Sequence, residues 1–256
     1  MGNAMIERAP KSVVILGATS AMARACAQDF ARQGYRVILG AQDSEENTRN
    51  AADIRVRYGV QCHALDFHAL DFDGHAAFLS ACEDTVGEVP GGVVAFFGYM
   101  AEQSVAQADF AEARKMVDVN LTAMISVLER FAARLEQRGS GFVGIVSSVA
   151  GDRGRQSNYI YGASKAGLTA YASGLRNRLF KAGVTVTTIK PGFVDTKMTF
   201  GLPLPGPLVA SPEKAGGDVC RAVLAGKNEA YVPFFWQFIM LIIKYVPEFQ
   251  FKKMKL

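Results

Sequence analysis

The chain has 256 residues, of which 50% are apolar and 20% are charged, and its formal net charge is +4. This length is sufficient for one large domain with an ample core. The small, scattered positive charge gives no basis for expecting nucleic-acid binding. No apolar run reaches the ~20 residues that a membrane-spanning helix needs, and residues 1–10 lack the apolar region of a signal peptide. We therefore expect a cytoplasmic protein with an N-terminal extension over residues 1–10.

The cysteines are isolated from one another and show neither a CxxC pair nor the spacing of metal ligands. This pattern favours reduced thiols over a disulfide framework, and we expect no metal site. The four positions are Cys26, Cys62, Cys82 and Cys220.

The first predicted strand, over residues 12–16, has the sequence SVVIL. A continuous β-branched run is typical of a strand that is buried on both faces. The small residues GATSAMA follow, and a helix is predicted over 23–33. A strand, a tight turn and a helix N-terminus in this order create an anion site, because free backbone N–H groups point at the same place. Further strands are predicted over 35–40, 60–66 and 92–97, with helices over 44–58 and 73–86.

In the second half, two helical segments are predicted within 104–137, the longer of them over about 112–137. They are followed by a strand over 142–147, a helix over 159–181 and a strand over 184–190. After these come a proline-rich loop over 201–208, a helix over 212–225 and a strand over 229–232. This alternation predicts an α/β fold: a doubly wound parallel sheet of the Rossmann type, with about seven strands and helices on both faces. A single domain of this type over 11–232 and a tail over 233–256 account for the chain.

Residues 147–165, SSVAGDRGRQSNYIYGASK, place a hydroxyl, a phenol and an amine in one short segment. If Tyr161 opens a helix, Lys165 lies four residues on and on the same face. A tyrosine ordinarily has a pKa of ~10, so we expect the Lys165 ammonium to favour the phenolate. Ser148 would hold a carbonyl or hydroxyl oxygen within reach of Tyr161. A tyrosine and a lysine four apart also arise often by chance, so this pair alone is weak evidence.

The wider pattern is more specific. Glycines, polar residues and a Pro-Gly pair occur in the order and spacing of the short-chain dehydrogenase/reductase superfamily, which the chain resembles over residues 11–232. The positions that carry this resemblance are Gly17, Asp66, Gly98, Asn120, Ser148, Tyr161, Lys165, Pro191 and Gly192. The resemblance implies an NAD(P)-dependent oxidoreductase that acts on CH–OH and C=O groups.

The resemblance also implies roles for individual residues. Ser148, Tyr161, Lys165 and Asn120 would be catalytic, with Tyr161 as the acid/base and Asn120 positioning a water on a proton relay to Lys165. The cofactor would be held around its phosphates and ribose by the first loop, at the adenine by the third strand, and at the nicotinamide by the sixth strand and its loop. The implied cofactor-binding set is Gly17, Thr19, Ser20, Met22, Gln42, Asp66, Phe67, Gly98, Lys165, Pro191, Gly192, Val194 and Thr196.

The sequence departs from the family pattern at three places. Ala21 and Ala23 stand where later glycines of the first loop are usual. The segment Phe96 to Tyr99 replaces the common Asn-Asn-Ala-Gly and keeps only its glycine. Gly40 occupies the place of the acidic residue that grips the ribose 2′-hydroxyl of NAD, which leaves room for a 2′-phosphate and favours NADP(H) over NAD(H), although Gln42 replaces the usual arginine.

The tail contains the apolar run 234–243, FFWQFIMLII, followed by Lys244, Lys252, Lys253 and Lys255. Two interpretations are open: a segment that lies at the membrane interface, peripheral on the inner face of the cell membrane, or a helix that packs over the substrate cleft or in a dimer contact. Arg153 and Arg155 could meet a phosphate at the substrate opening or could simply be solvated.

Within the superfamily, the chain resembles the decaprenylphosphoryl 2-keto-pentose reductase-like group. The segments that carry this resemblance are GATSAMARACA, residues 147–167, IKPGFVDTKMT, GLPLPGPL and the tail. This resemblance implies a 2-keto sugar on a polyprenyl phosphate as the substrate and a partner oxidase that makes the ketone. The resemblance to the superfamily implies a homo-oligomer, because long helices such as those over 112–137 and 159–181 commonly pair in it. The alternatives are a reductase of a 3-oxoacyl thioester or another hydrophobic ketone, and a non-catalytic nucleotide-sensing protein.

Overall fold

The structure is a computed structural model that describes residues 11–197, 199, 201 and 205–254. The predicted extension over 1–10, part of the proline-rich loop and Lys255 lie outside the described residues.

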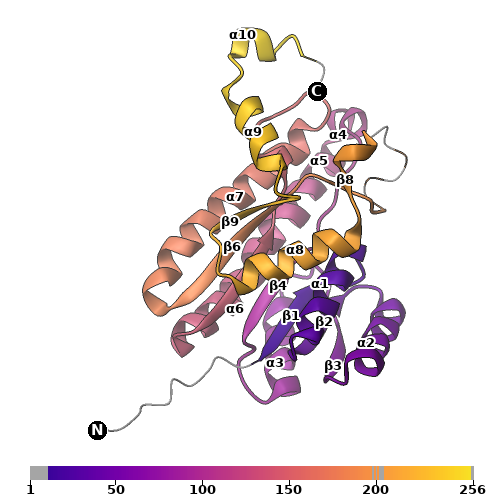
Figure 1. The fold of residues 1–256 in the computed structure, drawn as a ribbon, viewed down its shortest axis with the longest axis vertical. Helices are drawn as coiled ribbons and strands as arrows, with labels where there is room; N and C mark the ends of the chain where they lie inside the picture. Colours follow the sequence, from indigo (N-terminus) through magenta and orange to yellow (C-terminus); the bar gives the residue numbers. More distant parts are fainter. Residues whose placement is uncertain (1–10, 198, 200, 202–204, 255–256) are drawn as a thin grey trace.

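Seven parallel strands form the central sheet, in the order β3-β2-β1-β4-β5-β6-β9 (Figure 1). The prediction of a doubly wound parallel sheet is therefore confirmed. The strands are β1 (Ser12–Leu16), β2 (Arg36–Ala41), β3 (Cys62–Asp66), β4 (Gly92–Ala95), β5 (Gly141–Val146), β6 (Val184–Pro191) and β9 (Glu229–Val232), and the two-residue strands β7 (Phe193–Val194) and β8 (Val209–Ala210) pair separately.

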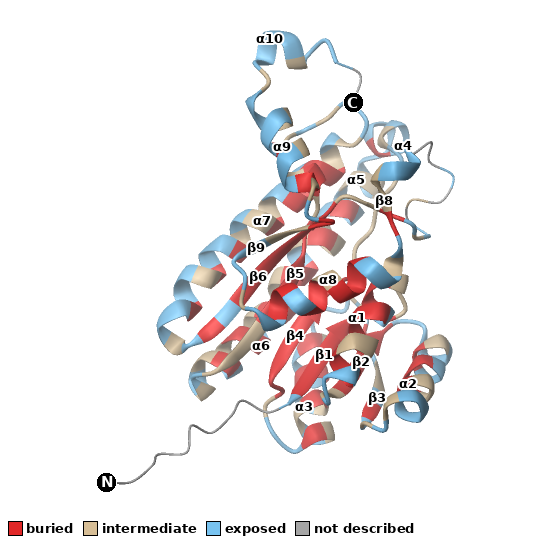
Figure 2. Ribbon diagram, viewed as in Figure 1, coloured by how far each residue is buried: buried red, intermediate tan, exposed pale blue. Residues whose placement is uncertain are grey.

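The connecting helices cover both faces of the sheet. They are α1 (Ala21–Arg32), α2 (Ser44–Tyr58), α3 (Gly74–Val86), α4 (Gln103–Ala108), α5 (Phe110–Val117), α6 (Ala123–Arg138), α7 (Tyr159–Leu179) and α8 (Pro212–Leu224). Successive side chains of a strand point to opposite faces, and in β1 Val13 and Ile15 join the core of α1, α2 and α8 while Val14 and Leu16 join that of α3, α6 and α7. Figure 2 shows this buried centre and the exposed outer faces of the helices.

Two boundaries differ from the sequence prediction in ways that matter for function. Strand β4 ends at Ala95, so Phe96 and Phe97 belong to the loop at its end. The predicted helix over 112–137 contains a five-residue π-helical stretch, Asp118–Thr122, between α5 and α6. A π-turn adds a residue to the helical repeat, and such bulges often occur at functional sites. Here it buries Asn120 completely.

The crossover in strand order lies between β1 and β4, where the chain winds outward in both directions. In open parallel sheets, ligands bind in the crevice at the carboxyl ends of the strands beside such a switch point. The loops after β1, β4 and β5 therefore mark the place to look for a site.

Candidate active site

A cavity of about 970 Å³ opens at the carboxyl ends of the strands. It brings together most of the residues expected from the sequence. The expected residues that line it are Gly17, Thr19, Ser20, Met22, Gln42, Phe67, Gly98, Ser148, Tyr161, Lys165, Pro191, Gly192, Val194 and Thr196. Asp66 and Asn120 are not among the lining residues. Asp66 lies at the end of β3 and accepts a hydrogen bond from Ser44 at 2.5 Å.

The loop between β1 and α1 approaches the end of β4 very closely. Gly17 has φ +75°, and a Cβ at this position would lie 2.7 Å from the backbone nitrogen of Phe97. The backbone N–H groups of Gly17 and Ala18 both donate to the carbonyl of Gly40. Only a glycine can occupy such a position. The loop therefore forms a narrow cradle beside the N-terminus of α1, and residues 19–22 at that N-terminus line the cavity. A helix N-terminus of this kind suits a pyrophosphate, so a dinucleotide fits the residues present.

Ser148, Tyr161 and Lys165 lie together on the wall of this cavity. Ser148 begins the short turn after β5, and its hydroxyl accepts a hydrogen bond from the Ala150 N–H at 3.1 Å. Tyr161 lies in the first turn of α7 and is buried. Lys165, one turn later, donates from Nζ to the Val146 carbonyl at 3.1 Å, and its Nζ lies 5.8 Å from the centre of the Tyr161 ring.

The pKa of the phenol differs from the sequence expectation. Burial raises the pKa of Tyr161 to about 12, and the hydrogen bond with Ser148 opposes that rise only in part. Burial also lowers the pKa of Lys165 to about 8. The expectation of a depressed tyrosine pKa was wrong for this structure, because withdrawal of the phenol from water is the dominant influence on its pKa. A phenol in this state is fully protonated at neutral pH and is suited to donating a proton.

The Asn120 side chain is hydrogen-bonded to the backbone of the loop that follows β4. Its side-chain oxygen accepts from the Tyr99 N–H at 2.7 Å, and its amide nitrogen donates to the Tyr99 carbonyl at 2.8 Å and to the Ser164 hydroxyl at 3.1 Å. A Cβ at Gly98 would lie 3.1 Å from Asn120 Oδ1 and 3.5 Å from Lys165 Nζ. Gly98 therefore lets the loop, Asn120 and Lys165 converge.

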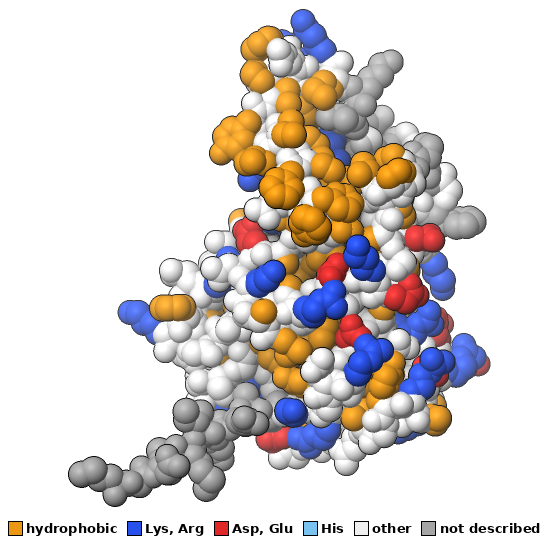
Figure 3. All heavy atoms as spheres, viewed as in Figure 1, with side chains coloured by type: hydrophobic (Ala, Val, Ile, Leu, Met, Phe, Trp, Pro, Cys, Tyr) orange, Lys and Arg blue, Asp and Glu red, His pale blue; other side chains and the backbone are white. Residues whose placement is uncertain are grey.

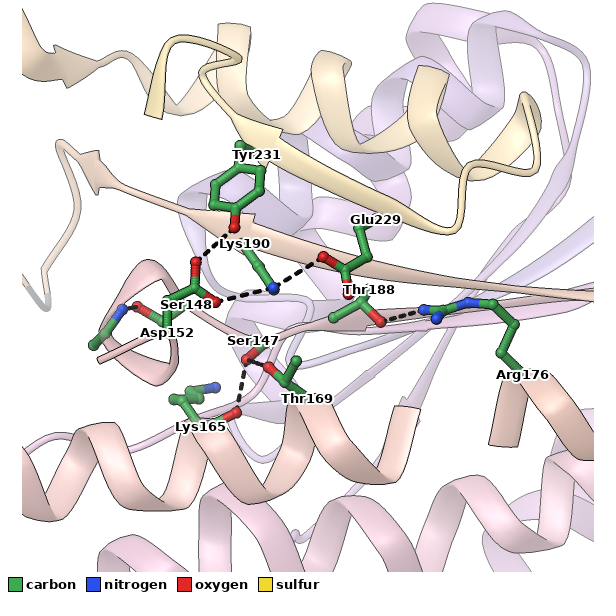
Figure 4. Close-up of polar contacts among 11 residues, drawn as sticks. Ser147, Ser148, Asp152, Lys165, Thr169, Arg176, Thr188, Lys190, Glu229 and Tyr231 are labelled. Carbon is green, nitrogen blue, oxygen red and sulfur yellow. Dashed lines mark hydrogen bonds and ion pairs between the residues drawn. The ribbon is translucent and has the colours of Figure 1, made fainter. Parts of the chain in front are cut away.

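A buried polar network fixes the loop that follows Ser148 (Figure 4). Lys190 on β6 forms ion pairs with Asp152 and Glu229, each at 2.9 Å, and the Tyr231 hydroxyl donates to Asp152 at 2.6 Å. Burial acts to lower the pKa of Lys190, but its hydrogen bonds with Glu229 and Asp152 outweigh burial and raise it. The network joins β6, β9 and the Ser148 loop into one rigid unit.

The tail forms α9 (Trp236–Tyr245) and α10 (Glu248–Phe251), which project from the body of the protein (Figure 1). Trp236 and Met240 are buried against Val149. Trp236 also lies against Gly192, where a Cβ would come within 2.0 Å of its indole nitrogen. The first turns of α9 therefore pack over the cavity wall, in agreement with the packing interpretation for this part of the tail.

Arg153 performs neither of the roles expected from the sequence. Its guanidinium donates to the carbonyls of Ile243 and Val246, both at 2.6 Å, pairs with Glu248 at 2.8 Å, and lies 3.6 Å from the centre of the Phe251 ring. These carbonyls end α9 and have no partner within the helix. Arg153 is thus a structural link between the Ser148 loop and the tail.

Four residues that the sequence reasoning did not include, Arg24, Glu46, Lys115 and Asn158, also line the cavity. Arg24 and Glu46 lie in the first turns of helices that follow strands β1 and β2, a signal that position alone could have supplied. Lys115 on α5 lies 4.3 Å from the centre of the Tyr99 ring, a contact that only the tertiary structure shows.

Comparison with known proteins agrees with this geometry. Residues 11–203 match the family model described as short chain dehydrogenase. An uncharacterized oxidoreductase of Mycobacterium tuberculosis is 32% identical over 242 residues, which cover 94% of this chain and 96% of that protein. The 3-oxoacyl-[acyl-carrier-protein] reductase MabA of the same species is 27% identical over 232 residues, covering 87% and 88%.

Two solved structures have the same fold. A variant of the actinorhodin polyketide ketoreductase, solved with NADPH, superposes with a TM-score of 0.79 at 19% identity and covers 88% of this chain and 97% of its own. A short-chain dehydrogenase from Sphingobium yanoikuyae, in complex with NADPH, superposes with a TM-score of 0.79 at 22% identity and covers 93% and 97%.

Proposed function

Since the chain is an oxidoreductase of the short-chain dehydrogenase family, we propose that it is an NADPH-dependent ketoreductase with Tyr161 as the proton donor. The observation that carries this proposal is the convergence of Ser148, Tyr161 and Lys165 on one cavity wall beside the Gly17 cradle. A reduced nicotinamide bound along Pro191 and Gly192 would supply the hydride.

The residues of the chain perform the remaining tasks. The Ser148 hydroxyl donates a hydrogen bond to the carbonyl oxygen of the substrate and holds it near the phenol. Tyr161, whose pKa is about 12, gives its proton to that oxygen as negative charge develops there. Lys165 stabilises the phenolate that remains, and Asn120, whose side chain holds the Tyr99 backbone, keeps the Gly98 loop in place.

Replacement of the phenol tests the assignment. Tyr161→Phe removes one hydroxyl from a buried ring, so we expect turnover to fall at least ~10²-fold while NADPH affinity changes little. Tyr159→Phe is the matched control, because Tyr159 lies two residues earlier on the same helix and is 46% exposed. Equal turnover of the Tyr161→Phe protein and the wild type would defeat the assignment.

The preference for NADPH follows from the end of β2. Gly40 leaves no carboxylate against a ribose 2′-hydroxyl, and Ser20, Arg24 and Gln42 are among the residues that line the cavity. Glu46 also lines the cavity, but its carboxylate would repel a 2′-phosphate. Arg24 is the only cation among these residues, so it is the group that would favour the 2′-phosphate. We expect Arg24→Gln to weaken NADPH binding by about tenfold and leave NADH binding unchanged; an equal effect on both cofactors would refute this role.

The proposed substrate is a 2-keto sugar on a polyprenyl phosphate, reduced after a partner oxidase has made the ketone. The apolar tail beside the cavity supports a lipid-linked substrate. The alternative is a 3-oxoacyl thioester, the substrate type named for the relative MabA. NADPH oxidation with a farnesyl-phosphoryl 2-keto-pentose and with acetoacetyl-CoA separates them, because the proposal requires turnover of the first.

We propose further that the outer face of α9 and α10 rests on an anionic membrane surface at the cytoplasmic side. Trp236 and Met240 occupy the inner face, while the outer face exposes Phe238, Leu241, Ile242 and Tyr245 at helical spacing. Figure 3 shows apolar side chains gathered over this region. Lys244, Lys252 and Lys253 accompany it, and such a pairing of apolar and basic residues suits anionic lipid. No helix among the described residues is long and apolar enough to cross a bilayer.

Sedimentation with vesicles tests this surface without removing the buried part of the tail. The double variant Phe238→Ser, Ile242→Ser should lose binding to vesicles that contain phosphatidylglycerol. Phe110→Ser is the control, since Phe110 is 79% exposed on α5, outside the tail. If the double variant binds vesicles like the wild type, or if it changes the oligomer mass instead, the face contacts something other than lipid.

A further inference from the structure

Arg155 and Asn158 lie between Ser148 and Tyr161 in the chain and line the same cavity. We propose that they form a recognition subsite in which Arg155 binds a phosphate group of the substrate and Asn158 accepts a hydrogen bond from a substrate hydroxyl. This inference rests on the proposed ketoreductase function and adds to it the two residues that would recognise the phosphate and a hydroxyl of the substrate.

Both side chains present buried polar atoms that other protein groups do not satisfy. Among the described residues, neither Arg155 Nε nor Asn158 Oδ1 has a hydrogen-bond partner, and both atoms are shielded from bulk solvent. Buried polar atoms in proteins are nearly always partnered, so such exceptions require an explanation. Both side chains line the cavity, so a ligand there would give these atoms partners once the side chains turn toward it.

The neighbouring charges do not neutralise Arg155. Asp152 is already engaged by Lys190 and by the Tyr231 hydroxyl, and Arg155 forms no salt bridge within the described part of the chain. Burial lowers the pKa of Arg155, and the charge of Asp152 acts in the opposite direction without forming a contact. A half-buried guanidinium of this kind is stabilised by an anion that enters the cavity.

Arg153 provides an internal contrast. Two residues earlier in the same loop, its guanidinium is used by the α9 carbonyls and Glu248. From the sequence, both arginines were candidate phosphate ligands, but the structure leaves only Arg155 available for one.

The charge of the cavity lining favours an acidic ligand. Its only carboxylate among the described residues is that of Glu46, in the first turn of α2, whereas Lys115 and Arg155 line the cavity together with Tyr99, Ser148 and Tyr161. Phosphate matches the planar fork of an arginine, which can bind it through two N–H groups. The unpartnered Asn158 oxygen needs a donor and so selects a hydroxyl, which a sugar carries and an oxoacyl thioester does not carry next to its ketone.

A binding experiment tests the phosphate contact without depending on turnover. Calorimetric titration of the NADP⁺-loaded protein with farnesyl phosphate should show binding that Arg155→Gln weakens at least ~10-fold, the scale of one charged hydrogen bond. Arg155→Lys should recover part of the loss. Arg57→Gln, on the exposed face of α2, should change nothing.

Two further ligands identify the group that is recognised. Farnesol, which has no phosphate, should bind the wild type and Arg155→Gln with equal affinity. Inorganic phosphate should compete with farnesyl phosphate for the wild type and should not compete for Arg155→Gln. Equal affinity of farnesyl phosphate for the wild type and Arg155→Gln, with cofactor affinity and melting temperature retained, would overturn the proposal. If Arg155→Gln does not fold, equal affinity of farnesyl phosphate for the wild type and Arg155→Met would overturn it as well.

Asn158 is tested by kinetics with the farnesyl-phosphoryl keto-pentose. Asn158→Ala should raise KM several-fold with little change in kcat, and farnesyl phosphate affinity should stay constant because that probe has no sugar hydroxyl. A loss in kcat alone would mean that Asn158 only supports the start of α7. Absence of turnover with every ketone would refute the proposed reductase while leaving the phosphate contact to be judged by titration.

Discussion

The buried ammonium of Lys165 predicts a specific dependence of stability on pH. Its pKa is about 8 in the folded protein, against 10.5 for an ordinary lysine. Each pKa unit corresponds to about 1.4 kcal/mol, so burial of the charge costs on the order of 3 kcal/mol at pH 7. The unfolded chain binds more protons between pH 8 and 10.5, and stability therefore rises with pH across this window.

Lys165→Met removes the titrating group and should remove this contribution. Between pH 7 and pH 9, the free energy of unfolding of the wild type should rise by about 1 kcal/mol relative to that of the variant. Urea unfolding of both proteins at pH 7, 8 and 9 measures the difference. The comparison uses the change in unfolding free energy with pH. The variant also loses the hydrogen bond to Val146, but this loss lowers the unfolding free energy equally at all pH values and does not alter that change.

The matched control is Lys181→Met, the same substitution at an exposed lysine. Its stability should follow that of the wild type at all three pH values. If the wild type and Lys165→Met run parallel from pH 7 to pH 9, Lys165 does not carry a buried charge, and its proposed role beside Tyr161 fails with that result.

Two further substitutions test the surroundings of the site. Gly192→Ala places a methyl group against the Trp236 indole, so it should displace α9 and lower both the melting temperature and turnover, whereas Gly206→Ala, with open space around it, should do neither; unchanged melting of Gly192→Ala would refute this packing. Lys190→Met leaves the Asp152 carboxylate buried without its cation and should cost about 3–5 kcal/mol in urea unfolding, much of which Asp152→Asn in the same chain should restore; no recovery would mean that the pair does not act as a unit.

The sequence predicted the sheet because central strands such as β1 and β4 are continuous apolar runs, and it predicted the cavity wall because Tyr161 and Lys165 are one helical turn apart. It could not predict the π-stretch around Asn120, since one added residue in a helix leaves no compositional trace. The raised pKa of Tyr161 was missed for another reason: burial depends on what the whole fold places around the phenol.

The sequence also could not predict contacts between distant parts of the chain. Arg153 and Arg155 have similar local sequences, and only the return of the tail, about ninety residues later, separates a structural arginine from one with an unsatisfied nitrogen. The same return packs one face of α9 against the body of the protein and leaves the other face exposed, and contact of that exposed face with a membrane stays a proposal.

Trp236 is the only tryptophan in the chain, and its position against Gly192 makes it a natural optical probe. Its fluorescence arises from a single environment, so changes in emission can be assigned without labelling. Reduced nicotinamides absorb light where tryptophan emits, and energy transfer would quench the indole when NADPH binds along Pro191 and Gly192. One spectrum could then report cofactor arrival, and a red shift would report the release of α9 from the body of the protein.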